Sequence, residues 1–192
     1  MAIFASGSGT NMQRITEYFA GNPGVDISLL VCNKAGAGVI DRAKQLGVPH
    51  KLIDRQSFYG SAALSEELIS LQIDLIVLAG FLWLIPDHLL KAFPDRILNI
   101  HPALLPRYGG KGMYGMKVHE AVIAARETTS GITIHLVNAH YDEGTILFQE
   151  SIALAGDETP ESLATRIHAL EYQHFPLVIE KYLWELTGPV SS

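Results

Sequence analysis

Apolar residues gather in short runs along the chain, and stretches with helical spacing separate most of these runs. Segments 27–32 (ISLLVC) and 74–79 (DLIVLA) are nearly continuous apolar runs, as expected of strands buried on both faces of a parallel sheet. In segment 11–19, Met12, Ile15 and Phe19 fall on one face of a predicted helix. The pattern predicts strands over residues 1–5, 27–32, 50–53, 74–79, 96–100, 132–137 and 146–153, and helices over residues 11–19, 39–46, 62–71, 87–92, 116–126 and 160–186.

Strands and helices alternate along the first 100 residues, which predicts right-handed βαβ units and a parallel sheet. Segments 132–137 and 146–153 follow each other with no helix between them, so we expect an antiparallel strand near the C-terminal part. The predicted fold class is α/β: an open, mostly parallel twisted sheet of Rossmann-like type with helices on both faces. We expect one domain over residues 1–192.

The amino-acid composition disfavours two classes of binding partner, nucleic acids and membranes. The chain of 192 residues has 20 acidic and 14 basic side chains and a formal net charge of −6, which disfavours a nucleic-acid partner. The longest apolar run, 75–85, is too short to span a bilayer, so we expect no membrane partner. A lone cysteine, Cys32, cannot form an internal disulfide, and a reducing compartment is the simpler interpretation. We therefore expect a soluble, cytoplasmic protein that is a monomer or homodimer.

The first candidate site is ASGSGTN, residues 5–11, between a predicted strand and a predicted helix. Backbone N–H groups at such a helix N-terminus can face an anion. The segment is not a P-loop, and Met12 stands where the third glycine of a dinucleotide fingerprint would be. The second strand ends in Cys32-Asn33-Lys34, with no acid to bind a ribose diol, which favours a monophosphate over NAD. An ordinary tight turn between strand and helix remains the alternative.

The second candidate site is LNIHPALLP, residues 98–106. Side chains alternate along a strand, so Asn99 and His101 face the same way, roughly 6.6 Å apart, while Ile100 points into the core. Pro102 ends the strand at the edge where open parallel sheets bind ligands. The strand therefore carries an amide and an imidazole into a crevice, unless both residues only satisfy backbone groups of the loop.

The third candidate site is NAHYDEG, residues 138–144, which by itself is ordinary hairpin-turn chemistry. A metal site is disfavoured because the eight histidines are scattered. The segment HEAVI, which begins at His119, also lacks the second histidine of a zinc motif.

Taken together, the segments SGSGTN, VCNKAGAG, VLAGFLWLI, LNIHPALLPRYGG and GITIHLVNAHYDEGTILFQ resemble, in order, those of the phosphoribosylglycinamide formyltransferases, folate-dependent enzymes of de novo purine biosynthesis. The resemblance implies a formyltransferase-type fold. It also implies metal-independent transfer of a formyl group from 10-formyltetrahydrofolate, as co-substrate, to the amine of N1-(5-phospho-D-ribosyl)glycinamide through a tetrahedral intermediate. The expected partners are these small molecules, glycinamide ribonucleotide and the folate.

The same resemblance assigns roles to individual residues. The catalytic residues of the family correspond to Asn99, His101 and Asp142. Its substrate contacts correspond to Gly9, Thr10 and Asn11, with Glu171 as the acid that binds the ribose. Its folate-binding loops correspond to Leu82, Trp83, Leu84 and Ile85, and to Asn138, Ala139, His140 and Tyr141. Two positions depart from the family pattern: Ser61 stands where members of the family have an arginine near the folate tail, and Trp83 stands where they often have an arginine in the folate loop.

The implied chemistry fits the residue types. Attack of an amine on a formyl carbon builds an oxyanion, which Asn99 and a protonated His101 can stabilise. We expect Asp142 to raise the pKa of His101 and keep it charged. Two alternatives stay open: a hydrolase that passes the formyl group to water, and a non-catalytic nucleotide-binding module.

Overall fold

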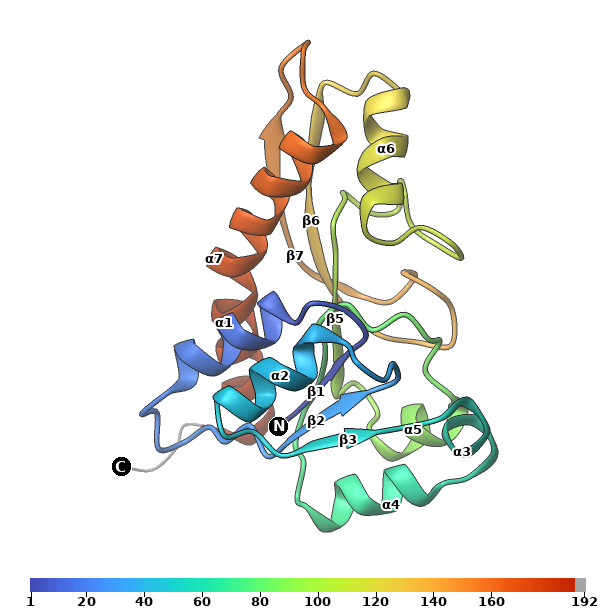
Figure 1. Ribbon diagram of the computed structural model, residues 1–192, viewed down its shortest axis with the longest axis vertical. Coiled ribbons are helices and arrows are strands. Elements are labelled where there is room, and N and C mark those ends of the chain that lie inside the picture. The colour runs from blue at the N-terminus through green and yellow to red at the C-terminus, as the bar shows by residue number, and fades with distance from the viewer. Residues whose placement is uncertain (189–192) are drawn as a thin grey trace.

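A seven-stranded sheet forms the centre of the protein, in the strand order β3-β2-β1-β4-β5-β6-β7. The computed structural model describes residues 1–188 and is drawn in Figure 1. Strands β1 to β5 run parallel to one another, whereas β6 runs antiparallel to both β5 and β7. The strands are β1 (Ala2–Ala5), β2 (Leu29–Cys32), β3 (His50–Leu52), β4 (Ile76–Leu78), β5 (Ile97–His101), β6 (Thr129–Leu136) and β7 (Ile146–Ala153).

Helices cover both faces of this sheet. The helices are α1 (Thr10–Phe19), α2 (Gly38–Gln45), α3 (Arg55–Gly60), α4 (Ala63–Ser70), α5 (Asp87–Ala92), α6 (Met116–Ala124) and α7 (Pro160–Thr187). In β1, the side chains of Ile3 and Ala5 belong to a core that α1, α2, α6 and α7 cover. Ala2 and Phe4 belong to a second core, which α3, α4 and α5 cover. Figure 1 shows the long helix α7 passing beside α1 and reaching α6.

The predicted fold class is confirmed, with two antiparallel pairings at the C-terminal side of the sheet. Helix α7 begins with a cap, in which Thr159 Oγ1 accepts a hydrogen bond from Ser162 N at 3.2 Å. The short helix α3 was not predicted. It begins after Asp54, whose Oδ1 accepts a hydrogen bond from Ser57 N at 2.9 Å, and it buries Phe58. No helix within residues 1–188 is long and apolar enough to cross a membrane.

The strand order changes direction between β1 and β4, and this positions the site. Strands β2 and β3 lie on one side of β1, while β4 and β5 lie on the other. The connections that leave β1 and β4 therefore diverge, and open a crevice at the carboxyl ends of these strands.

Candidate active site

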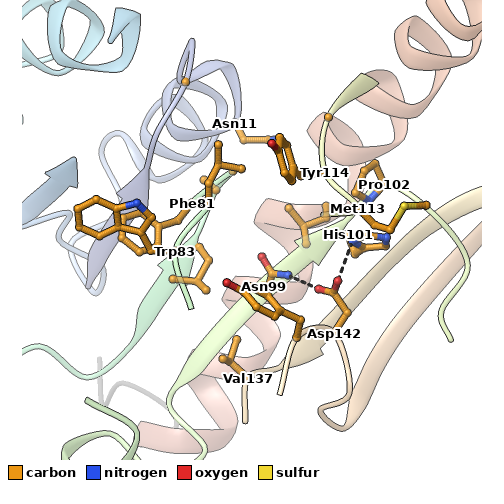
Figure 2. Close-up of a pocket in the computed structure, with 18 of the residues that line it drawn as sticks. Asn11, Phe81, Trp83, Asn99, His101, Pro102, Met113, Tyr114, Val137 and Asp142 are labelled. Carbon is orange, nitrogen blue, oxygen red and sulfur yellow. Dashed lines mark hydrogen bonds and ion pairs between the residues drawn. The ribbon is translucent and has the colours of Figure 1, made fainter. Parts of the chain in front are cut away.

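A pocket of about 590 Å³ opens at the carboxyl ends of β1, β4 and β5. Residues from the loop between β6 and β7, from the glycine-rich loop before α6, and from α6 and α7 complete its wall. Figure 2 shows the side chains of Asn99 and His101 directed toward Asp142, with Asn11 in a separate part of the pocket. The three candidate sites found in the sequence thus converge on a single cavity.

Three polar side chains meet at the end of β5. Asn99 Nδ2 lies 3.4 Å from Asp142 Oδ1, and His101 Nδ1 lies 3.6 Å from Asp142 Oδ2. The backbone N–H of Gly110 donates a hydrogen bond to Asp142 Oδ2 at 2.9 Å. Asp142 therefore lies between the amide and the imidazole, although the turn that carries it is 41 positions or more from both in sequence (142 − 101).

The histidine His135 joins this cluster. Antiparallel pairing places His135 opposite Asn99, and Asn99 Nδ2 lies 3.1 Å from His135 Nε2. His135 Nδ1 lies 2.8 Å from the carbonyl oxygen of Leu136, which can only accept, so Nδ1 carries the hydrogen. Nε2 is therefore the ring nitrogen that lies beside the Asn99 amide, and a second amide hydrogen of Asn99 faces Asp142. This second contact is long for a hydrogen bond, so that hydrogen is free to engage a ligand.

Burial sets the charge of His101. His101 is only 3% exposed, and this burial lowers its pKa below the ordinary value of 6.5. The nearby Asp142 charge and the hydrogen bond to Tyr108 raise the pKa, but they only partly offset the burial. The expectation that Asp142 keeps His101 charged is therefore wrong for the free protein, because desolvation of the imidazolium outweighs the carboxylate.

Asp142 stays ionised in the same surroundings. Burial alone would raise the pKa of Asp142, yet the contact with His135, 3.6 Å from Nε2 to Oδ1, the neighbouring His101 and the N–H of Gly110 together outweigh it. The net effect is a pKa below the ordinary value of 3.8. The site at neutral pH thus holds a carboxylate beside an uncharged imidazole, a pair suited to receiving one proton.

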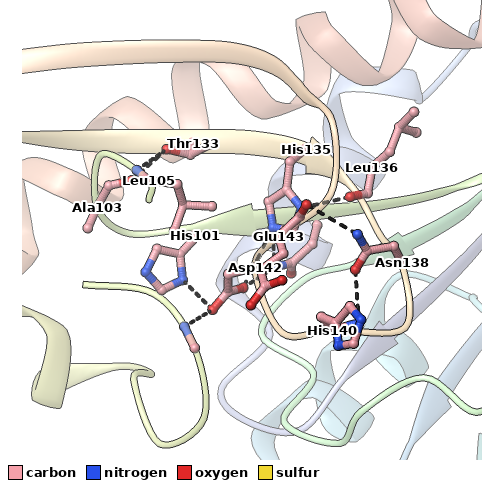
Figure 3. Close-up of polar contacts among 12 residues, drawn as sticks. His101, Ala103, Leu105, Thr133, His135, Leu136, Asn138, His140, Asp142 and Glu143 are labelled. Atoms are coloured by element: carbon pink, nitrogen blue, oxygen red, sulfur yellow. Dashed lines mark hydrogen bonds and ion pairs between the residues drawn. The ribbon is translucent and has the colours of Figure 1, made fainter. Parts of the chain in front are cut away.

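A buried hydroxyl supports the loop that follows β5. Thr133 Oγ1 donates a hydrogen bond to the carbonyl of Ala103 at 2.7 Å and accepts one from Leu105 N at 3.0 Å. Gln149 Nε2 lies 2.8 Å from the same hydroxyl and 3.1 Å from the carbonyl of Leu105. Figure 3 shows Thr133 beside Ala103 and Leu105, with His101 nearby. These bonds fix the turn that the sequence predicted at the end of the strand.

The glycine loop after β1 forms another part of the pocket, together with the first turn of α1. Thr10 and Asn11 line this part, and Asn11 Nδ2 donates a hydrogen bond to Glu171 Oε2 at 2.8 Å. Glu171 is 5% exposed, and its burial raises the pKa to about 7, although the bond from Asn11 lowers it in part. Gly9 also lines the pocket, but it has a structural role as well, since its φ is 80° and an added Cβ would lie 2.4 Å from a Val39 methyl group.

Most of the residues expected in the folate loops line the pocket. They are Leu82, Trp83, Leu84, Ile85, His140 and Tyr141. Asn138 and Ala139 do not line it. Asn138 instead closes the turn, because its Oδ1 accepts from His140 N at 2.9 Å and its Nδ2 donates to the carbonyl of Glu143 at 3.1 Å. Figure 3 shows Asn138 beside His140 in this turn.

Two further histidines line the pocket without having been predicted. His119 of α6 and His168 of α7 are both pocket residues, and burial lowers the pKa of His119 to about 4. In the sequence, His119 was a candidate only for a zinc motif, which its segment does not complete. Within residues 1–188, no group of three His, Cys, Asp or Glu side chains is placed to hold a metal ion.

Comparisons with known proteins agree across most of the chain. A family model described as formyl transferase matches residues 1–179, a span that contains every pocket residue. The chain is 41% identical over 199 residues to the chloroplastic phosphoribosylglycinamide formyltransferase of Arabidopsis thaliana, covering 98% of this chain and 68% of that protein. It is 37% identical over 187 residues to the phosphoribosylglycinamide formyltransferase of Bacillus subtilis (strain 168), covering 95% of this chain and 93% of that protein.

The fold is similar to that of a solved structure as well. A crystal structure of phosphoribosylglycinamide formyltransferase from Bacillus halodurans superposes with a TM-score of 0.84 at 37% identity. The superposition covers 95% of this chain and 94% of that chain.

Proposed function

This chain belongs to the formyl transferase family, and from that premise we propose that it transfers the formyl group of 10-formyltetrahydrofolate to the amine of glycinamide ribonucleotide. The observation that carries the proposal is the meeting of Asn99, His101 and Asp142 in one pocket with the glycine loop and Glu171. The pocket thus offers groups for proton transfer and groups for a phosphorylated ribose. Two relatives named for this reaction are 41% and 37% identical to the chain.

The amine nitrogen attacks the formyl carbon, and its electron pair forms the new C–N bond while the carbonyl electrons move onto oxygen. Asn99 stabilises this oxyanion with the amide hydrogen that only the long contact to Asp142 occupies. The oxyanion then re-forms the carbonyl, and the bond between the formyl carbon and N10 of the folate breaks.

His101 moves the proton in this scheme. Its pKa lies below 6.5, so the ring is uncharged when the amine attacks and can take the proton that the amine loses. The imidazolium that forms lies beside Asp142, whose negative charge stabilises it. The same proton then passes to N10 of the leaving folate, which restores the neutral ring.

The remaining residues bind the two substrates. The N-terminus of α1, with Thr10 and Asn11, supplies N–H and side-chain donors to the phosphate. Glu171 accepts hydrogen bonds from the ribose hydroxyls. The backbone of the segment from Leu82 to Ile85, with His140 and Tyr141, lines the folate part of the pocket.

The proposal is tested by measuring release of tetrahydrofolate from 10-formyltetrahydrofolate with and without glycinamide ribonucleotide. We expect release only when the ribonucleotide is present, with formylated ribonucleotide as the product. Release at the same rate without the ribonucleotide would identify a hydrolase instead. Asn99→Ala should lower kcat by roughly 10² to 10³, the usual loss for one donor to an oxyanion, with little change in KM.

The oligomeric state and location stay predictions. We propose a single-domain monomer or homodimer in the cytoplasm. Sedimentation of the purified protein tests the oligomeric state, and fractionation of the native cells tests the location. The Arabidopsis relative is named as chloroplastic, so a plastid location would be the contrary result.

A further inference from the structure

An arginine lies on an aromatic platform beside the folate part of the pocket. The guanidinium carbon of Arg55 is 5.4 Å from the ring centre of Tyr59 and 5.9 Å from that of Trp83. The ring centre of Trp83 in turn lies 6.2 Å from that of Tyr59 and 5.4 Å from that of the buried Phe58. We call Arg55, Tyr59 and Trp83 the cationic platform. Stacking on two rings limits the positions that the guanidinium can occupy.

The platform is fixed to the pocket wall. Tyr59 Oη donates a hydrogen bond to the carbonyl of Leu84 at 3.0 Å, and Leu84 and Trp83 both line the pocket. Figure 2 shows Trp83 across the pocket from His101. Arg55 itself does not line the pocket, so its charge lies just outside the wall that Trp83 forms.

The charge of Arg55 has no partner in the part of the chain that the structure describes. Its guanidinium makes no hydrogen bond and no ion pair within residues 1–188, whereas Arg14, Arg107 and Arg166 each pair with a glutamate. Ser61 and Trp83 carry no charge. A cation without a partner, held on rings at the edge of a ligand pocket, is arranged to receive an anion from the ligand.

The proposed co-substrate supplies such an anion. A reduced folate consists of a pterin, an aminobenzoyl ring and a glutamate, with the formyl group on the nitrogen between the first two parts. When the formyl carbon lies beside Asn99 and His101, the glutamate is the part that extends farthest from the chemistry. We propose that Arg55, held by Tyr59 and Trp83, binds the glutamate carboxylates of the folate co-substrate, an inference that rests on the proposed function.

An arginine suits this task better than a lysine would. A guanidinium can donate two parallel hydrogen bonds to a carboxylate while its flat face stays on an aromatic ring. The carboxylates lie far from the formyl carbon, so the contact is equally strong in the ground state and in the transition state. It should therefore affect KM for the folate and leave kcat unchanged.

The test compares two co-substrates, 10-formyltetrahydrofolate and the analogue that ends at the aminobenzoyl carboxyl group without glutamate. Arg55→Gln should raise KM for the full co-substrate by roughly 5- to 20-fold, as expected for a charged hydrogen bond at a partly exposed site. It should change KM for the truncated analogue by less than about twofold, and leave kcat and KM for the ribonucleotide unchanged. Arg55→Lys should recover only part of the loss.

Arg14→Gln is the matched control, because Arg14 also stacks on a tyrosine, at 5.4 Å from the ring centre of Tyr172, but lies outside the pocket lining. This variant should change KM for neither co-substrate. Lys111, a cation that does line the pocket, is the competing residue. Equal effects of Arg55→Gln on both co-substrates, or a glutamate-dependent effect of Lys111→Gln in its place, would overturn the proposal.

Calorimetry separates this inference from the proposed function. Dissociation constants are measured for tetrahydrofolate and for its analogue without glutamate, with no formyl transfer required. If the wild-type chain transfers no formyl group yet prefers the glutamate form, and Arg55→Gln removes that preference, then the reaction is wrong and the role of Arg55 stands. If the chain transfers the group but shows no such preference, the role of Arg55 is wrong and the reaction stands.

Discussion

The ring nitrogen Nε2 of His101 lies 2.7 Å from the backbone carbonyl oxygen of Tyr108. A carbonyl oxygen only accepts, so Nε2 carries the hydrogen, and Nδ1, which faces Asp142, is the nitrogen that gains a proton. The phenol of Tyr108 donates to Glu127 Oε1 at 2.6 Å, and Arg107 pairs with the same carboxylate. Glu127 thus acts on the imidazole through Tyr108, without touching it.

Glu127→Gln is expected to loosen Tyr108 and weaken its bond to His101. Loss of one such hydrogen bond should lower kcat by roughly 3- to 10-fold with little change in either KM. Because the bond to Tyr108 raises the pKa of His101, the acidic limb of the kcat profile should move to lower pH. Glu158→Gln, which also removes a charge paired with an arginine, is the control. A variant with an unmoved pH profile would show that Glu127 serves stability alone.

Asp142→Asn should lower the pKa of His101 further. Burial lowers this pKa and the Asp142 charge opposes it, so removing the charge leaves the burial unopposed. NMR titration of the His101 ring measures the change directly.

Turnover tests whether His101 and Asp142 act together. The single variants His101→Ala and Asp142→Ala should each lose roughly 10² to 10⁴ in kcat. The double variant should be little worse than the poorer single one, and fully multiplicative losses would mean that the two residues act independently.

Gly7 offers a cleaner test of the phosphate loop than Gly9 does. A side chain at Gly7 would meet no atom within 4 Å and would project from a residue that lines the pocket. Gly7→Val should therefore weaken binding of the ribonucleotide far more than binding of the folate, with the free energy of unfolding changed by less than about 0.5 kcal/mol.

Gly9→Ala should instead destabilise the fold, because its φ of 80° and the contact with Val39 both exclude a Cβ. Equal weakening of both ligands by Gly7→Val, measured by calorimetry, would remove the loop from the phosphate site.

Glu171 should make the fold less stable as pH rises. Its pKa is about 7 in the folded protein, against an ordinary value of 4.5 that we take for the unfolded chain. Between these values the unfolded chain releases a proton that the folded protein keeps, so the stability is complete below pH 4.5 and falls until about pH 7. The loss is on the order of 3 kcal/mol, at about 1.4 kcal/mol for each pH unit.

Glu171→Gln retains an acceptor for Asn11 Nδ2 and removes this loss. Urea unfolding should show the variant to be more stable than the wild type at pH 8 and equal to it at pH 4. Glu185→Gln, at an exposed glutamate, should show no such difference. A constant difference between variant and wild type across this pH range would mean that the pKa of Glu171 is the same in the folded and the unfolded chain.

The sequence predicted the parts of the fold and site that depend on local periodicity. Alternation along a strand was enough to place Asn99 and His101 on one side of β5. The partner His135 was not predicted to matter, because its contact with Asn99 depends on the register between β5 and β6. Helix α3 was missed because six residues give little periodicity, although Asp54 was a usable cap signal.

The charge of His101 was beyond sequence reasoning for a different reason. The carboxylate that raises its pKa could be inferred from motif order, but the extent of burial could not. Desolvation depends on packing from β5, β6 and the glycine-rich loop at once, so the sign of the net shift required the structure.

The hydrogen bond between Asn11 and Glu171 joins residues 160 positions apart. During synthesis the glycine loop emerges early, whereas the acid that completes this part of the pocket lies on α7 and emerges after all seven strands. Contacts so distant in sequence form late, because the chain between the two residues must first lose the conformational entropy of closing a long loop. A nascent chain can therefore assemble most of its sheet and still be unable to bind the ribonucleotide. It gains this ability only when α7 packs against the sheet.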